Sequence, residues 1–332
     1  MIRLYFFCFT WWMFFACTNQ NDTEKIAYRG KAFGTTYTVQ FYPNSLNTTV
    51  KKKSLDSIIE VINLSMSTYQ DNSLISKINK GDKVIVDTHF ENVFKASKSL
   101  HRKTLGIFDP TIGILVNAWD FGPESKIVAI DSVQIDSLLR SVGLSKVELR
   151  DRVLYKENPN TFLDFNALAK GYAVDVVAEF LKQNNIVNFL VEIGGEIRSG
   201  GINLAKSQPW KIGVEDPNFD GSQSYSKVIP LKDQAMATSG SYRKFKIDEE
   251  GNRYAHIIDT KTGYPLRSNL LSVSVIAPTC MIADAYATTF MAMGLEASKT
   301  FLRKETSLQA FFIYSNNESL QTLGINGFPG LD

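Results

Sequence analysis

The chain groups its helix and strand patterns unevenly, and this grouping limits its fold more than any other feature. An apolar stripe with helical spacing runs from Leu55 to Met66, and helical patterns recur at residues 90–105 and 131–142. Strand patterns predominate from residue 146, and Phe189–Ile193 is a compact apolar run suited to a buried central strand. Because helices and strands do not alternate regularly, the pattern predicts an α+β fold with mixed and antiparallel sheets and packed helices.

The rest of the chain adds further strands and helices to this arrangement. Further strands are expected at residues 36–41, 146–150, 152–156, 161–165, 210–215, 226–231, 256–259, 271–276 and 308–314, and further helices at 167–183, 280–293 and 295–304. Gly194-Gly195 and Gly200-Gly201 are interpreted as tight turns at strand ends. Their spacing matches neither G-x-G-x-x-G nor a phosphate-binding loop, which argues against a Rossmann dehydrogenase and a P-loop NTPase.

The N-terminus carries the features of an export signal. Arg3 precedes an apolar run from Leu4 to Ala16, which is shorter than the about 20 residues of a membrane-spanning helix. A small residue followed by Cys17 resembles a lipobox, so residues 1–16 are expected to be removed and Cys17 to be lipidated, with residues 17–25 as a tether. The alternative is ordinary secretion with cleavage nearby. Either way we expect an exported protein, and the lipobox predicts one anchored to a bacterial membrane and facing the periplasm.

Charge and cysteine content narrow the classes of function. The chain has 36 basic and 34 acidic residues, and removal of residues 1–16 takes away only Arg3, which leaves a net charge of +1. This near-neutral balance gives no reason to expect a nucleic-acid partner. Cys280 is the only cysteine after Cys17, and it is interpreted as a small buried hydrophobe rather than a nucleophile.

One helical pattern combines a carboxylate with a hydroxyl. Asp284 and Thr288 are four residues apart, so a helix would bring them to the same face. Their hard oxygens suit Mg²⁺ or Ca²⁺ rather than zinc. The alternative is a helix with one solvated polar face, but the many alanines around the pair would allow another segment to pack closely.

Two further segments contain residues able to bind anions or move protons. Asp164–Tyr172 is expected to lead from a strand into a helix N-terminus, where free amides and Lys170 would favour an anion; Asp164 is alternatively a simple helix cap. His256 precedes a predicted turn and is a candidate general base, the alternative being a structural histidine. No role is predicted for His89 and His101.

Several separated segments, taken in order, share their content with one known family. They are Gly30–Tyr37, Met66–Tyr69 with Ser73–Ser76, Gly106–Thr111 with Trp119–Gly122, Asp164–Tyr172, Glu192–Glu196, Thr238–Tyr242, His256–Gly263 and Ala283–Thr288. Together they resemble the ApbE family of FAD:protein FMN transferases over nearly all of the chain that follows the signal. The resemblance implies one two-lobed catalytic domain over residues 26–332, related to the T-fold.

The resemblance also implies roles for individual residues. A divalent metal, Mg²⁺ or alternatively Ca²⁺, would be held by the Asp284 carboxylate, the Thr288 hydroxyl and the main-chain carbonyl of Ala167. Contacts to the flavin and adenine of FAD would come from Phe33, Tyr69, Ile107, Phe108, Asp109, Asp164, Lys170 and Ile258. His256 matches the family's proposed base. Two positions differ from the family pattern: Phe33 stands where Met is usual, and Asn166 where Gly or Ser is usual.

The implied reaction moves the FMN half of FAD onto a Thr or Ser hydroxyl of another protein and releases AMP. The acceptors would be flavoprotein subunits of membrane redox complexes. Two alternatives stay open: hydrolysis of FAD to FMN and AMP if water takes the place of the acceptor, and a lipoprotein that binds flavin without turnover. A pure binding protein would not need His256 beside the Asp284 and Thr288 pair.

Overall fold

A computed structural model describes residues 24–44, 49–124, 130–217, 224–241, 245–247, 253–316 and 319–330. The expected signal peptide, Cys17 and most of the tether lie outside these residues, so their assignment stays a prediction. No helix within the ranges just given is long and apolar enough to cross a membrane.

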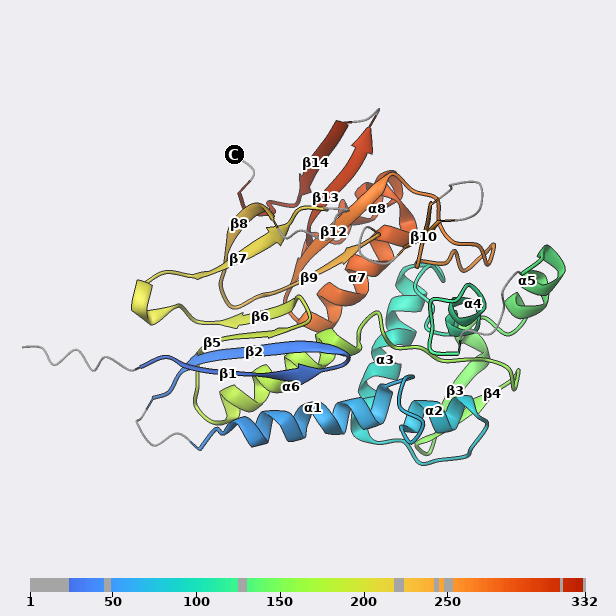
Figure 1. Ribbon diagram of the computed structural model, residues 1–332, viewed down its shortest axis with the longest axis horizontal. Coiled ribbons are helices and arrows are strands. Elements are labelled where there is room, and N and C mark those ends of the chain that lie inside the picture. Colours follow the sequence, from blue (N-terminus) through green and yellow to red (C-terminus); the bar gives the residue numbers. More distant parts are fainter. Residues whose placement is uncertain are drawn as a thin grey trace, which may run out of the picture.

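An eight-stranded antiparallel sheet forms the centre of the fold (Figure 1). Its strands, in spatial order, are β1 (Ile26–Ala32), β2 (Thr35–Tyr42), β5 (Asn188–Ile193), β6 (Glu196–Gly200), β9 (Ala235–Gly240), β12 (Leu270–Ala277), β13 (Gln309–Asn316) and β14 (Ser319–Ile325). Every neighbouring pair in this sheet is antiparallel. The predicted α+β class is therefore confirmed, and Phe189–Ile193 lies in an interior strand as expected.

Three two-stranded hairpins and eight α-helices surround this sheet in the described part of the chain. The hairpins are β3–β4 (Val147–Arg150, Val153–Lys156), β7–β8 (Trp210–Glu215, Tyr225–Leu231) and β10–β11 (Phe245–Ile247, Arg253–Ala255). The helices are α1 (Lys52–Met66), α2 (Leu74–Asn79), α3 (Thr88–Lys103), α4 (Gly113–Ala118), α5 (Ser132–Leu139), α6 (Ala169–Gln183), α7 (Cys280–Met293) and α8 (Leu295–Leu302). Short 3₁₀ turns lie at Leu144–Lys146 and Leu204–Lys206.

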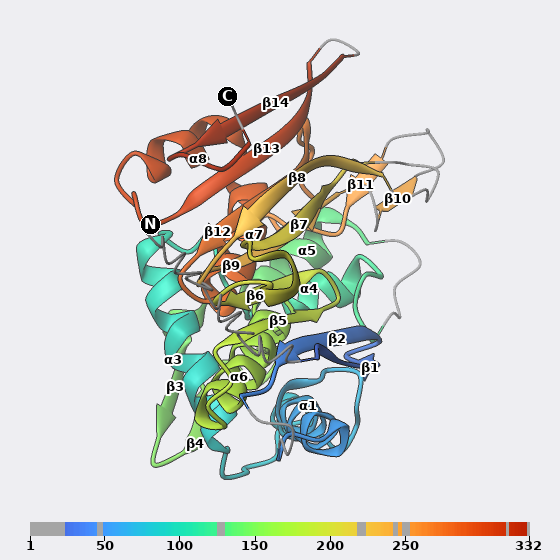
Figure 2. The same ribbon diagram turned by 90° about the vertical axis from the view of Figure 1, so that its left-hand side faces the viewer.

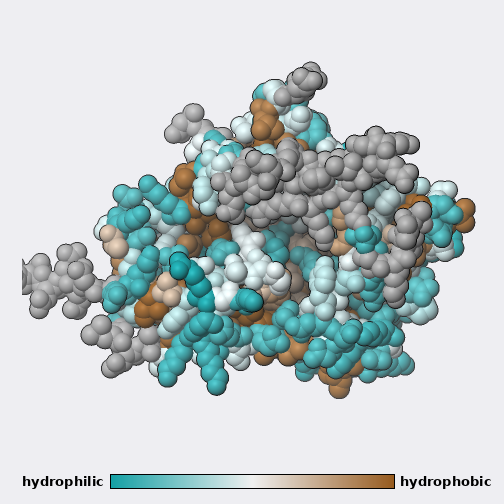
Figure 3. Space-filling model, in the orientation of Figure 1, coloured by the Kyte–Doolittle hydropathy of each residue, from teal (hydrophilic) through white to brown (hydrophobic). Residues whose placement is uncertain are grey.

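The central sheet is covered on both faces (Figure 2). Alternate residues of a strand point to opposite faces, and β13 shows the consequence. Phe312 packs into the large core that contains α6 and α7, whereas Phe311 packs with Trp210 and Ile229 of the β7–β8 hairpin. The outer surface is more polar: Figure 3 shows hydrophilic side chains along the lower edge, where Figure 1 places α1 and α2.

Helices α6 and α7 approach each other very closely. A Cβ atom added to Gly171 of α6 would lie 2.4 Å from the carbonyl oxygen of Cys280 and 2.8 Å from Cβ of Asp284. Only glycine allows this distance, so the first turn of α6 rests directly on the backbone of α7. The alanines on either side of Asp284, Ala283 and Ala285, are fully buried, and the close contact with α6 is made by Gly171.

Replacing Gly171 by alanine is expected to destabilise the protein. Helix propensity alone would favour alanine by about 1 kcal/mol, but the added methyl meets backbone that has no rotamer to change. We expect a net loss of about 1–3 kcal/mol in the free energy of unfolding, the usual cost of overpacking. Denaturant unfolding measures it, and a gain in stability would show that α6 and α7 do not touch at Gly171.

Two expected strands are wrong. Residues 161–165 and 256–259 form loops, each with a single isolated bridge, Ile112 to Phe162 and Ile258 to Pro265. In the first loop the amides bond outside any ladder: Leu163 N donates to Asn79 Oδ1 at 2.8 Å, and Asp164 N donates to the Pro110 carbonyl at 2.7 Å. The segment is buried, as its apolar residues suggested, but it is not paired as a strand.

Candidate active site

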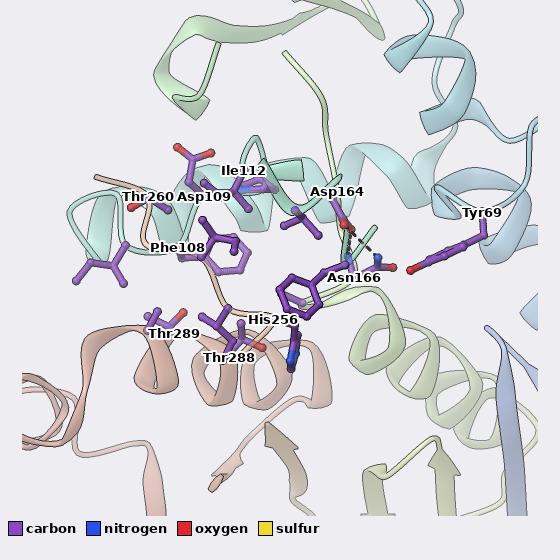
Figure 4. A pocket seen from close by; sticks show the side chains of 18 residues that line it. Tyr69, Phe108, Asp109, Ile112, Asp164, Asn166, His256, Thr260, Thr288 and Thr289 are labelled. Atoms are coloured by element: carbon purple, nitrogen blue, oxygen red, sulfur yellow. Dashed lines mark hydrogen bonds between the residues drawn. The ribbon is translucent and has the colours of Figure 1, made fainter. Parts of the chain in front are cut away.

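One open cavity gathers most of the residues singled out in the sequence (Figure 4). It has a volume of about 940 Å³ including its mouth. The predicted residues that line it are Tyr69, Ile107, Phe108, Asp109, Asp164, Ala167, His256, Ile258 and Thr288. They come from loops after α1 and α3, the loop before α6, the loop after β11, and helix α7. Long connections therefore converge on one space although their residues are far apart in sequence.

The walls of the cavity are mainly apolar and aromatic. Besides the predicted residues, they include Pro110, Ile112, Val116, Phe121, Asn166, Ile257, Thr260, Thr289 and Ala292. Tyr69 stands at the rim with 61% of its surface exposed, and Figure 4 shows its ring extending toward the loop that carries Asn166. An apolar cleft with a free aromatic ring at its mouth suits a flat ring system as ligand.

His256 enters the cavity from the loop that follows β11. It is partly exposed, and its ring lies edge-on to Phe121 with 6.4 Å between ring centroids. The other two histidines lie elsewhere: His89 Nδ1 is 3.0 Å from the Tyr172 hydroxyl, and His101 Nδ1 is 3.1 Å from the Phe108 carbonyl. Neither lines the cavity.

Asp109 lines the cavity, but its carboxylate accepts hydrogen bonds from Thr111 and Leu144. Oδ1 accepts from the Thr111 amide at 2.8 Å and the Thr111 hydroxyl at 2.6 Å. Oδ2 accepts from the Leu144 amide at 3.0 Å and lies 3.4 Å from His101 Nδ1. These bonds hold the wall of the cavity in shape, whereas direct contact of Asp109 with flavin stays a prediction.

Asn166, which differs from the family pattern, holds the carboxylate of Asp164 through two hydrogen bonds. Its backbone amide donates to Asp164 Oδ1 at 2.7 Å, and its side-chain amide donates to Asp164 Oδ2 at 3.1 Å (Figure 4). A glycine would lack the second of these bonds. In this chain the Asp164 carboxylate is therefore held in the cavity wall by its own loop.

Lys170 does not line the cavity and instead forms an ion pair with Glu196, in which the lysine side chain is 31% exposed. Its Nζ lies 2.6 Å from Glu196 Oε1, and Glu196 is 3% exposed. Burial alone would lower the pKa of Lys170, but the carboxylates of Glu196 and Asp284 outweigh it and raise that pKa. The contact of Lys170 with FAD stays a prediction. In the structure Lys170 pairs with Glu196, which the sequence did not indicate as a site residue. Glu196 could have been found in the sequence, because it ends one of the segments shared with the family, Glu192–Glu196.

Phe33 also lies outside the lining of the cavity. It occupies the β1–β2 turn with φ of 49°, a left-handed conformation that is rare for a bulky residue, and it packs against the main core. The neighbouring Thr35 lies close to Gly194, where an added Cβ would be 2.7 Å from Thr35 Cγ2. The turn therefore borders the β5–β6 turn near Lys170, and a contact of Phe33 with flavin stays a prediction.

Asp284 and Thr288 share one face of α7, as the spacing predicts. Asp284 is 4% exposed, and its Oδ2 accepts from the Gly171 amide at 3.0 Å. Burial raises the pKa of Asp284 well above its usual value, the Glu196 carboxylate raises it further, and Lys170 opposes both. The Thr288 hydroxyl reaches the cavity and is 2.9 Å from the Ser239 hydroxyl of β9, a partner that the sequence reasoning missed.

These features define a class of protein: an α+β fold whose loops build a ring-binding cleft, with a buried carboxylate and a hydroxyl on the helix beneath. The ApbE family profile matches residues 33–312, and the chain belongs to this family. An FAD:protein FMN transferase of Haemophilus influenzae is 35% identical over 324 residues, which cover 94% of this chain and 93% of that protein. One of Vibrio cholerae is 36% identical over 284 residues, covering 83% and 84%.

Solved structures agree with this assignment. The flavin transferase ApbE from Vibrio cholerae superposes with a TM-score of 0.81 at 32% identity, covering 91% of this chain and 97% of that one. The apo form of the Pseudomonas stutzeri flavinyl transferase ApbE gives 0.82 at 28% identity, with coverage of 92% and 96%. The family predicted from the sequence is confirmed.

Proposed function

We propose that this protein transfers the FMN half of FAD onto a Thr or Ser hydroxyl of another protein and releases AMP. The family assignment and the relatives named FAD:protein FMN transferase support FMN transfer from FAD. The observation that carries the proposal is the meeting of His256 with Thr288 and the aromatic walls in one open cavity. A cleft for a ring system and a candidate base therefore lie together.

We propose a divalent cation beside this cavity, held by two residues of its lining and by the buried Asp284, which does not itself line it. The donors would be the Asp284 carboxylate, the Thr288 hydroxyl and the Ala167 carbonyl, a hard-oxygen set suited to Mg²⁺ or Ca²⁺. Nearby, Glu196 Oε2 is buried and has no hydrogen-bond partner among the residues that the structure describes. Within those residues no three His, Cys, Asp or Glu side chains form a metal-binding group, and the proposed set needs only one carboxylate. When bound, the cation neutralises phosphate charge and stabilises the departing AMP.

His256 would supply the base for the reaction. An imidazole nitrogen takes the proton as the acceptor hydroxyl oxygen bonds to the FMN-side phosphorus. The bond between that phosphorus and the bridging oxygen breaks, and AMP leaves with that oxygen. The product is FMN joined to the acceptor through a phosphoester.

The reaction is tested by incubating the purified protein with FAD, Mg²⁺ and a flavoprotein subunit of a membrane redox complex. We expect the intact mass of the acceptor to rise by the mass of FMN less one water molecule. AMP should be released in an amount equal to the modified acceptor. AMP without an adduct would identify an FAD pyrophosphatase instead. Tight FAD binding with neither product would identify a protein that binds flavin without turnover.

Tyr69 provides a test of the ligand itself. If its exposed ring stacks on a ring of FAD, Tyr69→Ala removes a contact worth about 1–3 kcal/mol, the range for a base on an aromatic side chain. We expect the Kd for FAD to rise by roughly 5- to 150-fold, with little change in kcat at saturating FAD. Quenching of flavin fluorescence measures the Kd. Tyr155→Ala is the control, because Tyr155 is 46% exposed on β4 and does not line the cavity; equal losses in both variants would contradict the assignment.

We also propose that the protein is exported and held at a bacterial membrane through lipid on Cys17. The support is the apolar run from Leu4 to Ala16 and the cysteine that ends it. In a bacterial host, the wild type is expected to incorporate labelled fatty acid and to sediment with membranes. Cys17→Ser should lose both properties. Label in the Cys17→Ser variant would place the modification elsewhere.

A further inference from the structure

The first turn of α7 is capped by a residue from another helix. The side chain of its N-cap residue, Thr279, bonds none of the helix amides, and the buried Thr279 Oγ1 has no partner within the described ranges. Asp175 of α6 supplies the acceptors instead: Oδ1 takes the Cys280 amide and Oδ2 the Met281 amide, each at 2.9 Å. Free amides at a helix N-terminus need acceptors and favour negative charge. The start of α7 therefore depends on a carboxylate 105 residues earlier in the chain.

Asp175 is itself fixed to the central sheet. Arg198 of β6 donates from Nη1 to Asp175 Oδ1 at 2.8 Å, and the two side chains are only 12% and 13% exposed. The other guanidinium nitrogen, Nη2, lies 2.9 Å from Glu179 Oε1, also on α6. Because Arg198 holds the Asp175 carboxylate in place, that carboxylate links the start of α7 to both α6 and β6.

A second attachment lies one helical turn earlier on α6. Gly171, four residues before Asp175 and on the same face, donates its amide to Asp284 Oδ2 at 3.0 Å. Gly171 also leaves no room for a Cβ against the Cys280 carbonyl. Residues 171 and 175 thus hold the segment from Cys280 to Asp284, which fixes the position of α7 along α6.

We propose that Asp175 is a positioning residue of the active site, which holds α7 against α6 so that the oxygens of Ala167, Asp284 and Thr288 converge. This inference rests on the proposed function, because it takes those oxygens as the ligands of a divalent cation. Ala167 lies two residues before the first residue of α6, whereas the other two residues belong to α7. Mg²⁺ requires oxygens at about 2.0–2.1 Å in near-octahedral geometry, so a small slip of one helix along the other weakens binding.

The first test is Asp175→Asn, which keeps the size of the side chain but turns an NH₂ group toward one of the two amides. We expect the Kd for Mn²⁺, used as the probe cation and followed by the EPR signal of the free ion, to rise by about 10- to 100-fold, the range for residues that support metal ligands. Measured in the presence of FAD, the cation concentration for half-maximal transfer should rise similarly. Transfer at saturating cation should recover most of the wild-type kcat.

A second variant separates positioning from stability. Thr279→Asp in the Asp175→Asn background places a carboxylate at the N-cap of α7 itself, which restores a cap worth about 1 kcal/mol but not the link to α6. We expect the unfolding temperature to recover while the affinity for Mn²⁺ stays weak. Asp87→Ala is the control, because the Asp87 carboxylate caps α3 through the Phe90 amide at 2.8 Å, outside the cavity. It should lower stability without changing Mn²⁺ affinity.

The outcomes distinguish this inference from the proposed function. If Asp175→Asn binds Mn²⁺ as the wild type does, or if Thr279→Asp restores affinity together with stability, Asp175 serves stability alone and the inference is wrong. If Asp284→Ala loses Mn²⁺ while Asp175→Asn keeps it, the cation site stands and only the role of Asp175 falls. If the wild type binds no Mn²⁺ even with FAD, the cation site and this inference fall together.

Discussion

Replacing His256 by alanine is expected to lower the rate of FMN transfer by roughly 10²- to 10⁴-fold, the usual contribution of a positioned general base. The acceptor hydroxyl is a weak nucleophile until its proton is removed, and His256 is the only histidine among the residues that line the cavity. The walls that would hold the ring systems of FAD come from other residues, so the Kd for FAD should change by less than about threefold. Single-turnover transfer, measured by the mass of the acceptor, separates the chemical step from FAD binding.

Two comparisons sharpen the His256 result. His89→Ala removes a histidine that bonds to Tyr172 away from the cavity, and it should transfer FMN at close to the wild-type rate. Free imidazole added to His256→Gly should restore part of the lost rate, because it can occupy the space of the missing ring. Full activity of His256→Ala would show that the base is another group.

Elements with strong periodicity were predictable from the sequence, because burial on one face fixes their pattern. The stripe from Leu55 to Met66 became α1, and 280–293 was expected and found as α7. Several elements escaped prediction, among them the seven-residue edge strands β1 and β14, although the four-residue strands β3 and β4 were expected. Strand β6 has only five residues and ends in glycine, and helices α2 and α4 have six residues each. Such segments are too short to show a period, and tertiary packing determines their conformation.

Most of the predicted site positions line one cavity, but the contacts among them were not predictable. The helix N-terminus expected at Asp164–Tyr172 predicted an anion near Lys170, and in the structure the Lys170 ammonium pairs with the Glu196 carboxylate, 26 residues later. The partnership of Thr288 with Ser239 and the cap that Asp175 gives to α7 likewise join segments that only the fold brings together. Sequence spacing fixes contacts within one helix, whereas contacts between elements depend on how those elements pack.

Asp284→Asn is expected to reduce FMN transfer by at least about 10³-fold, because a divalent cation at developing phosphate charge contributes several kcal/mol and each 1.36 kcal/mol is a factor of ten in rate. The amide has the size of the carboxylate and still accepts from the Gly171 amide, so the fold should persist. What it lacks is the negative charge that the cation requires. Mn²⁺ binding and acceptor mass, measured on the same preparation, should both report the loss.

Stability should move in the opposite direction from activity in Asp284→Asn. In the cation-free protein, burial and then the nearby Glu196 carboxylate disfavour the ionised form of Asp284. Its pKa is raised for these reasons. The neutral amide removes both unfavourable effects, so the unfolding temperature without metal should equal or exceed that of the wild type. Asp56→Asn is the matched control, since Asp56 pairs with Lys52 and Tyr37 outside the cavity and should leave transfer unchanged. An active Asp284→Asn variant with undiminished Mn²⁺ affinity would show that the charge at this position does not hold the cation. A strongly destabilised variant would show that Asp284 is a structural residue, and that Lys170 already compensates the burial of its carboxylate.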